Sequence, residues 1–362
     1  MKTICFTVTN DLSYDQRMIR ICSTLSAAGY KVILIGRKKS TSPLLANQPF
    51  QQIRLNCFLS KGSGFYAEYN IRLFFYLLFC RIDAVCAIDL DTVLPCLWVS
   101  KLKKIKRVFD AHELFCEMKE VVSRPRVYRI WKAIEKYALP QFNKGYTVNL
   151  PLSEAYEKNY GLRLQVIRNM PRRRHLPSDL QRGDYILYQG AVNEGRCFET
   201  LLPAMKLISC QLMICGDGNF MQQAQQLVAE NEIADKVIFK GMVSPGDLFA
   251  YTSRAIAGIT LFESDSLNNY YSLANRYFDY IQAGTPQLAM NYPAYAALNQ
   301  MYATGVLIDK PTVEQIAEAL LQLLNDKILW NTLHNNCLSA AEVFCWEEEE
   351  KKLIAFYQHL FE

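Results

Sequence analysis

The sequence predicts two doubly wound α/β domains, each built on a parallel sheet, which face each other across a central cleft. Its 362 residues exceed what one compact domain usually holds. Short β-branched runs alternate with longer helical patterns, which is typical of parallel sheets covered by helices on both faces. A proline- and arginine-rich stretch over 169–184 interrupts this alternation, which then starts again. We therefore expect a first domain over 1–170, a linker over 171–183 and a second domain over 184–345.

The elements alternate in a regular order within each half. In the first half, a strand is expected at 2–10 and a helix over 14–30, followed by strands at 31–36, 84–90, 106–111 and 145–148. In the second half, strands and helices are expected in turn at 185–190, 198–209, 211–216, 221–232, 236–241, 244–254, 255–261 and 266–286, and then a strand at 306–310 and two helices. Doubly wound sheets bind ligands beyond the carboxyl ends of their strands, so the loops at those ends are the candidate site.

Composition indicates a globular cytoplasmic protein. The hydrophobic fraction is 51%, which excludes a disordered chain. No run of eighteen apolar residues lacks a charge, and the opening "MKTICFTVTND" is expected to be a buried strand and not a signal peptide. The 12 cysteines contain no C-x-x-C pair, which is typical of reduced, mostly buried thiols. The 4 histidines are scattered, and no zinc site is expected.

Charge differs between the two halves. Residues 1–178 hold 29 basic and 13 acidic side chains, a balance of +16, and the remainder holds 11 and 22, a balance of −11. From charge alone, the first half is expected to meet nucleic acid or an anionic membrane, unless two solvated surfaces simply differ in sign. Basic segments lie at 100–107, 124–132 and 171–175, and an aromatic-rich segment at 64–81 is either interfacial or a buried helix.

Three strand ends of the second half have features that suit an anionic ligand. Gly190 and Gly195 permit a tight turn, after which Arg196 opens a helix whose N–H groups can bind an anion. Gly216 and Gly218 follow the next strand and would let a ligand approach the backbone, although turns of this kind often need glycine anyway.

The third of these strand ends leads into a helix that begins with unusual polar residues. Asn275 and Arg276 supply donors to the helix start, and Asp279 can accept hydrogen bonds from hydroxyls. The alternative is an ordinary helix with an Arg–Asp pair at i,i+3. Three such sites together favour a nucleotide sugar.

The chain resembles glycosyltransferase family 4, whose members have the GT-B fold. The second half is similar to the family's donor domain in "YQGAVNEGRCFETLLPA", "ICGDGN" and "SLANRYFDYIQAGTP", and the first half in "FTVTNDLSYDQRMIRICSTLSAAGYKVILIGR", "AIDLDTVLP" and "FDAHELF". The tail over 346–362 looks like the family's closing helix, which crosses back to the first domain. The resemblance implies retaining transfer of a hexosyl group from a nucleoside diphosphate sugar to a hydroxyl of a cell-surface glycan or lipid-linked acceptor, without a metal or other cofactor.

The resemblance also assigns donor-side roles. Arg196 takes the position of the family's lysine and Arg276 that of the subgroup's lysine, so both are expected to bind the diphosphate. Asp279 is expected to accept from donor hydroxyls or ribose, with Asn275 orienting the same group. The family's Glu-x7-Glu pair falls on Tyr271 and Asp279, and the expected arginine after the first glycine falls on Ala191. Ala274 stands in place of a proline.

In the first half, "FDAHELF" places His112 and Glu113 directly after a strand. The family's histidine at this point implies that His112 donates a hydrogen bond to the donor sugar or lies beside the acceptor; alternatively it orders the loop. Asn10 and Asp11, at the end of the first strand, and Glu113 are possible acceptor contacts. Asp15 and Arg17 are expected at the surface or paired with each other.

The Asp-x-Asp at 89–91 could hold a metal ion, but we interpret Asp91-Thr92 as the capped start of a helix.

Three other classes of protein are alternatives to a glycosyltransferase. "VTNDLSYDQ" lacks the glycines of a dinucleotide oxidoreductase. An epimerase with the GT-B fold needs no basic first domain. A non-catalytic homologue that binds sugar or assists assembly is favoured by Tyr271 and Ala191. For the basic first half, we expect docking on the inner face of an anionic membrane, or alternatively a soluble acidic acceptor.

Overall fold

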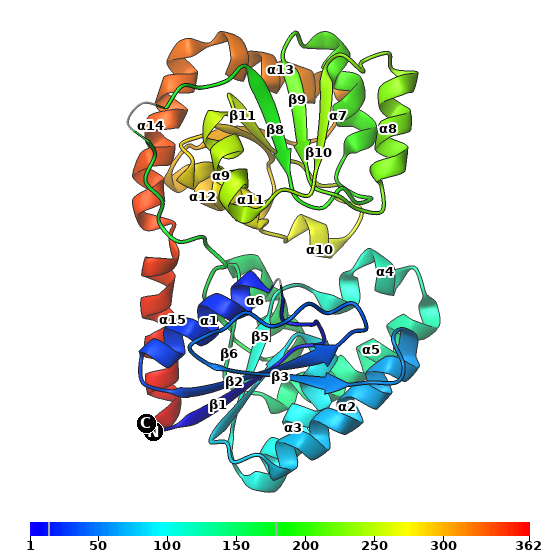
Figure 1. The fold of residues 1–362 in the computed structure, drawn as a ribbon, viewed down its shortest axis with the longest axis vertical. Helices are drawn as coiled ribbons and strands as arrows, with labels where there is room; N and C mark the ends of the chain where they lie inside the picture. The colour runs from blue at the N-terminus through cyan, green and yellow to red at the C-terminus, as the bar shows by residue number, and fades with distance from the viewer. Residues whose placement is uncertain (14, 178–179) are drawn as a thin grey trace. The chain divides into compact units, whose positions relative to one another are not determined.

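The structure is a computed structural model that describes residues 1–13, 15–177 and 180–362. The chain divides into two compact units, residues 1–169 with 349–362 and residues 170–348. Each unit is one parallel sheet with helices on both faces, which confirms the predicted pair of doubly wound sheets (Figure 1). The segment expected as a linker clusters with the second unit; its residues 178 and 179, and residue 14 of the predicted first helix, lie outside the described residues.

The first unit has a sheet in the order β3-β2-β1-β4-β5-β6-β7. The strands are β1 Thr3–Thr7, β2 Lys31–Lys38, β3 Gln51–Asn56, β4 Ala84–Ile88, β5 Lys106–Ala111, β6 Gly145–Thr147 and β7 Gln165–Val166. The two edge strands, β3 and β7, were not predicted. In β3, "QQIRLN", polar and apolar residues mix because an edge strand is only partly buried, so it lacks the continuous apolar run of a central parallel strand.

Helices cover both faces of this sheet. They are α1 Gln16–Ala27, α2 Gly62–Phe79, α3 Val93–Lys103, α4 Lys119–Val122, α5 Pro125–Ala138, α6 Leu150–Tyr160 and the closing helix α15 Trp346–Phe361. On one face, Tyr357 of α15 packs against Phe6 of β1 with ring centroids 6.0 Å apart, and Thr24 of α1 donates to Glu350 at 3.0 Å. On the other face, Thr7 of β1 bonds Thr92, next to α3, at 2.9 Å.

The second unit has a sheet in the order β10-β9-β8-β11-β12-β13. The strands are β8 Tyr185–Gln189, β9 Gln211–Cys215, β10 Val237–Gly241, β11 Ala257–Thr260, β12 Gln287–Met290 and β13 Gly305–Ile308. The helices are α7 Phe198–Ala204, α8 Met221–Glu230, α9 Pro245–Arg254, α10 Leu267–Tyr270, α11 Asn275–Gln282, α12 Pro293–Met301, α13 Val313–Asn325 and α14 Lys327–Val343. The strand order reverses at β8, which is where such sheets bind their ligands.

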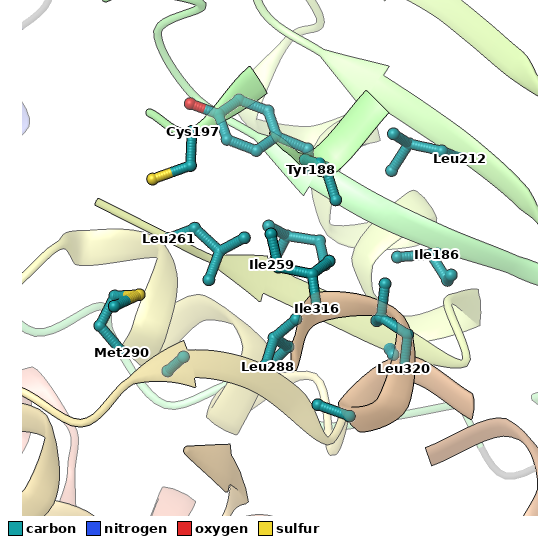
Figure 2. Packing of buried hydrophobic residues seen from close by; sticks show 14 of the residues in the cluster. Ile186, Tyr188, Cys197, Leu212, Ile259, Leu261, Leu288, Met290, Ile316 and Leu320 are labelled. Atoms are coloured by element: carbon teal, nitrogen blue, oxygen red, sulfur yellow. The ribbon is translucent and has the colours of Figure 1, made fainter. Parts of the chain in front are cut away.

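The core of the second unit fixes these strand ends in place. Figure 2 shows Ile186 and Tyr188 of β8 packed with side chains of β9, β11, β12 and α13, and all of them are fully or almost fully buried. The Tyr188 hydroxyl donates to the carbonyl of Ala191 at 2.6 Å, so the core directly holds the loop that follows β8. All twelve cysteines of the chain are free thiols, and most are buried. Among the described residues, no helix has the length and apolarity needed to cross a membrane.

Candidate functional site

Three loops at the carboxyl ends of β8, β9 and β11 are joined by backbone hydrogen bonds. Val192 N–H donates to Asp217 at 3.0 Å, and Phe220 N–H donates back to Val192 at 2.9 Å. Glu263, after β11, donates to the carbonyl of Gly195 at 3.1 Å. Because each loop is bonded to a neighbour, the three form one fixed platform at the point where the strand order reverses.

The four predicted glycines lie in this platform, and packing explains three of them. Gly190 and Gly216 have φ values of +123° and +152°, which side chains rarely adopt. A Cβ on Gly216 would lie 1.8 Å from the Gly190 carbonyl oxygen, and one on Gly218 would lie 2.3 Å from that of Val192. Gly195 also has a positive φ, +77°, but more open space around it. The loops therefore need these glycines to pack against one another, and direct contact with a ligand stays a prediction.

Arg276 and Arg196 converge on one aromatic ring. The Arg276 guanidinium lies 4.9 Å from the centroid of the Phe262 ring and 4.6 Å from that of Tyr188, and the Arg196 guanidinium lies 4.4 Å from Phe262. Arg276 Nη1 donates to the Gln189 carbonyl at 2.9 Å, while its buried Nε has no hydrogen-bond partner. Burial, and then the charge of Arg276, lower the pKa of Arg196.

No ion pair joins either of these guanidiniums to a carboxylate within residues 1–13, 15–177 and 180–362. Arg276 is only 8% exposed, so its charge is held mainly by the carbonyl and by the faces of two rings. Asn275, the first residue of α11, is exposed, and Ala274 before it provides no capping side chain. The arrangement places two nearby cations without a counterion at a strand end, which suits a ligand of negative charge.

Asp279 is bound into the same platform through Gln189, a residue that sequence reasoning missed. The Gln189 side chain donates to Asp279 Oδ2 at 3.1 Å and accepts from the Thr252 hydroxyl at 2.7 Å. Its main-chain carbonyl is the acceptor for Arg276. Gln189 thus links the carboxylate and the buried cation of α11 to the end of β8. The only signal was a polar residue closing the apolar run "YILYQ".

In the first unit, His112 lies among charged side chains at the carboxyl ends of β4 and β5. Arg17 Nη2 pairs with Asp110 Oδ1 at 2.8 Å, and both side chains are buried. His112 Nε2 lies 2.8 Å from Arg17 Nε and 3.1 Å from Asp110 Oδ2. Its backbone N–H donates to Asp89 Oδ1 at 2.8 Å, and its Nδ1 lies 3.5 Å from Asp89 Oδ2. The imidazole is therefore held on both ring nitrogens.

This network shifts the pKa values of its members. Burial alone would lower the pKa of His112, but the charges of Asp110 and Asp89 raise it to about 9. Burial raises the pKa of Asp89 to about 7 and that of Asp91, which accepts from the Thr9 hydroxyl, to about 6. Against the effect of burial, Arg17 and His112 lower the pKa of Asp110. Arg17 Nε–H can donate to Nε2 only while the imidazole is neutral. The charges of Asp110 and Asp89 favour the protonated imidazole near neutral pH, in which Nε2 donates to Asp110 Oδ2 instead.

Two predictions for the first unit were wrong. Arg17 is neither at the surface nor paired with Asp15: it is buried and pairs with Asp110, while Asp15 caps α1 by accepting from Met18 N–H at 3.0 Å. Asp91 and Thr92 do precede a helix, and Thr92 occupies the N-cap position of α3, but the expected cap role was wrong because its side chain makes no capping hydrogen bond. A short 3-10 turn at Leu90–Thr92 precedes α3, and no capping side-chain hydrogen bond is made at either start.

The possible acceptor-side residues have local partners. The Asn10 side chain donates to Asp15 at 2.7 Å and accepts from Leu12 N–H at 2.9 Å. Bonds of this kind to the backbone two residues on are typical of asparagine in turns. Asp11 accepts from the Ser42 hydroxyl at 3.1 Å. The carbonyl of Glu113, next to His112, accepts from the Tyr156 hydroxyl at 2.9 Å. These contacts explain the loop conformations, and a role toward an acceptor stays a prediction.

Comparison with known proteins found a matching family model and a curated relative. The family described as "Glycosyl transferases group 1" matches residues 178–342. A probable sucrose-phosphate synthase 2 from Oryza sativa subsp. japonica is 30% identical over 108 residues, which span 30% of this chain and 10% of that protein. The chain therefore aligns with only about a tenth of the curated relative it matches.

Solved structures match the chain over almost its whole length. A sucrose-phosphate synthase from Thermosynechococcus elongatus has a TM-score of 0.80 at 18% identity and covers 100% of this chain and 99% of its own. A glycosyltransferase from Rickettsia africae ESF-5 has a TM-score of 0.76 at 13% identity, with the same coverage. The Anabaena protein HepE, in complex with UDP and glucose, has a TM-score of 0.79 at 12% identity and covers 99% of this chain and 100% of its own. The family model therefore matches the second half of the chain, and the likeness to the solved structures shows that the chain has the GT-B fold.

Proposed function

We propose that this protein is a retaining glycosyltransferase that moves a hexosyl group from a nucleoside diphosphate sugar to a hydroxyl of a glycan or lipid-linked acceptor. The observation that carries the proposal is the pair Arg196 and Arg276, two cations that share the Phe262 ring without a counterion among the described residues. The family match of residues 178–342 supports it, as do the structures of HepE in complex with UDP and glucose and with UDP-glucose.

The chemistry requires stabilisation of a leaving diphosphate, which gains negative charge as the glycosidic bond breaks. Arg276 is preorganised for this role, because the Gln189 carbonyl and two ring faces fix its guanidinium before any ligand arrives. Arg196 adds a second positive charge, and the start of α11 adds backbone donors. We expect these groups to act without a metal ion, and Asp279 with Asn275 to bind donor hydroxyls.

In the first unit, we propose His112 as the second catalytic group. Its pKa of about 9 keeps the imidazole protonated near neutral pH, so it can donate a hydrogen bond to a hydroxyl of the donor sugar. Following the resemblance, the acceptor hydroxyl attacks on the face that the diphosphate leaves, and no protein nucleophile is used. We place the reaction in the cytoplasm, at the inner face of a membrane, in the synthesis of a cell-surface polysaccharide.

A non-catalytic homologue is the second candidate, favoured by Tyr271 and Ala191 at positions where the resemblance implies a glutamate and an arginine. A thermal-shift screen across nucleoside diphosphates and their sugars, followed by measurement of slow donor hydrolysis, separates the two. An enzyme is stabilised by a particular nucleotide and releases nucleoside diphosphate from the matching sugar donor. Stabilisation without any release, in the presence or absence of candidate acceptors, would support the binding protein.

A further inference from the structure

Helices α2, α3 and α5 pack side by side on the face of the first unit's sheet opposite α1 and α15 (Figure 1). On α2, Ile71, Phe75 and Phe79 follow one another at four-residue spacing, so they form one line along the helix. They are 59%, 54% and 82% exposed. Trp98 and Leu102 continue the apolar surface on α3, at 43% and 65%. We call this surface the α2–α3–α5 face.

An open groove of about 690 Å³ adjoins the aromatic line. Its walls are the edge strand β3 and helix α2, with Leu55, Ile71, Phe75 and Phe79 on the apolar side. The inner side of the same helix, at Leu73 and Leu77, is fully buried against the unit. The core of the unit is therefore packed by the inner side of α2, and the apolar side chains on its outer side are not needed for that packing.

Exposed basic side chains lie on the helices beside α2. On α5 the exposed side chains include Arg126, Arg129 and Lys136, and Lys101 on α3 and Lys104 after it are also exposed. The three helices contain only two acidic residues, and neither balances this charge at the surface.

Both acidic side chains are engaged within the unit. Glu135 is buried and pairs with Lys132 at 2.7 Å. Glu68 accepts from the backbone of Phe58 and Leu59, each at 2.8 Å. The α2–α3–α5 face thus combines exposed apolar side chains on α2 and α3 with exposed positive charge on α3 and α5.

We propose that the α2–α3–α5 face docks on an anionic lipid bilayer. A bilayer surface supplies both an apolar layer for exposed aromatic side chains and anionic headgroups for lysine and arginine. A second copy of this chain fits less well, because a symmetric contact would bring two faces of the same sign together. The docking itself can be measured without donor or acceptor, so it does not depend on the proposed function. Only the link between docking and a lipid-linked acceptor rests on the proposed function.

Co-sedimentation of the full chain with vesicles tests the proposal. We expect the protein to pellet with mixed phosphatidylcholine–phosphatidylglycerol vesicles at low salt, less at high salt, and least with phosphatidylcholine alone. Phe75→Ser/Phe79→Ser should weaken partition by roughly ten-fold per side chain on every vesicle. Arg126→Gln/Arg129→Gln/Lys136→Gln should weaken it by roughly five-fold per side chain, and only on anionic vesicles.

The matched control is Met242→Ser/Ile328→Ser, which removes two similarly exposed apolar side chains, 80% and 82%, from the second unit. Pelleting of this variant should equal that of the wild type. No binding to anionic vesicles at low salt, or an equal loss in the control, would overturn the proposal. A wild-type dimer in solution that Phe75→Ser/Phe79→Ser dissociates would assign the face to a second copy instead. Loss of vesicle binding with intact donor hydrolysis separates this inference from the proposed chemistry.

Discussion

At the carboxyl ends of the strands, the first unit neutralises its charges internally, whereas the second unit leaves positive charge without a counterion. In the first unit, Arg17, Asp110, His112 and Asp89 contact one another at 2.8–3.5 Å. In the second unit, the charges of Arg196 and Arg276 face aromatic rings and a carbonyl. The comparison teaches why we propose the second unit, and not the first, as the site of the diphosphate: its two guanidiniums have no carboxylate partner among the described residues, whereas the charged side chains of the first unit are paired with one another.

The largest expected effect is on the stability of the first unit. Arg17→Met would break the buried pair with Asp110 and leave that carboxylate with His112 alone; breaking a buried pair typically costs about 3–5 kcal/mol. Arg276→Met removes a cation that has no carboxylate partner among the described residues, so we expect a loss of only about 1–2 kcal/mol. Hydrogen exchange measured on peptides from 1–169 and from 170–348 should show the first loss in the first unit. Equal destabilisation by the two substitutions would contradict the contrast between the units.

The next effect is on turnover in the second unit. Arg196→Ala and Arg276→Ala should each lower the rate by roughly 10²–10³, because each removes a preorganised positive charge from the leaving diphosphate. The measurement is release of nucleoside diphosphate from the donor that stabilises the protein best. Lys310→Ala, an exposed site after β13, serves as the control. Rates within a few-fold of wild type in both arginine variants would remove the assignment.

Substitution of His112 in the first unit should also lower the rate of transfer. We expect His112→Ala to fold and to lose transfer by roughly 10²–10⁴, the range typical of a general acid or base. Thermal unfolding of the same sample checks the alternative, in which His112 only orders its loop. A variant that keeps transfer but melts well below wild type would support that alternative.

The smallest effect is the dependence of stability on pH. The pKa of His112 is raised from 6.5 to about 9, so its stabilisation is fully present below 6.5 and is lost as pH rises through 9. Burial raises the pKa of Asp89 to about 7, so its protonated form also stabilises the folded state, and this stabilisation is lost as pH rises to about 7. Melting temperatures recorded between pH 6.5 and 9 should therefore fall, and His112→Gln should flatten that part of the curve. A wild-type curve with no such fall would mean that the network does not hold the proton.

The sequence pattern placed Arg196 and Arg276 in the fold more readily than it placed Arg17 beside Asp110, for a physical reason. Arg196 follows β8 by a short turn with two glycines, and Arg276 opens α11 after a longer polar segment that follows β11, so both could be placed near a strand end from local pattern alone. Arg17 meets Asp110 across 93 positions of sequence, and only the strand order, with β4 and β5 beyond β1, brings them together. Asp89 adopts a positive φ of +52°, which no residue pattern announces for an aspartate.

Most of the fold followed from buried strands with continuous apolar runs. The fully buried strand β12 Gln287–Met290 was missed, because it is only four residues long and begins with a glutamine. The other errors lie where burial is partial. Strand β3 was missed at the sheet edge, and the segment 64–81 left two interpretations open. The structure makes most of that segment helix α2, with one side buried and the other exposed, so it combines a core helix with a surface line of aromatics.

The most direct test of the central claim is the affinity of the second unit's cation pair for a diphosphate. Calorimetric titration with UDP, and then with GDP and ADP, should show that the wild type binds at least one of them. In Arg196→Ala/Arg276→Ala that affinity should fall by roughly 10² or more, because two desolvated charge-assisted contacts are lost. Lys310→Ala should bind like the wild type. Undiminished binding by the double variant, or no binding of any of the three by the wild type, would contradict the account.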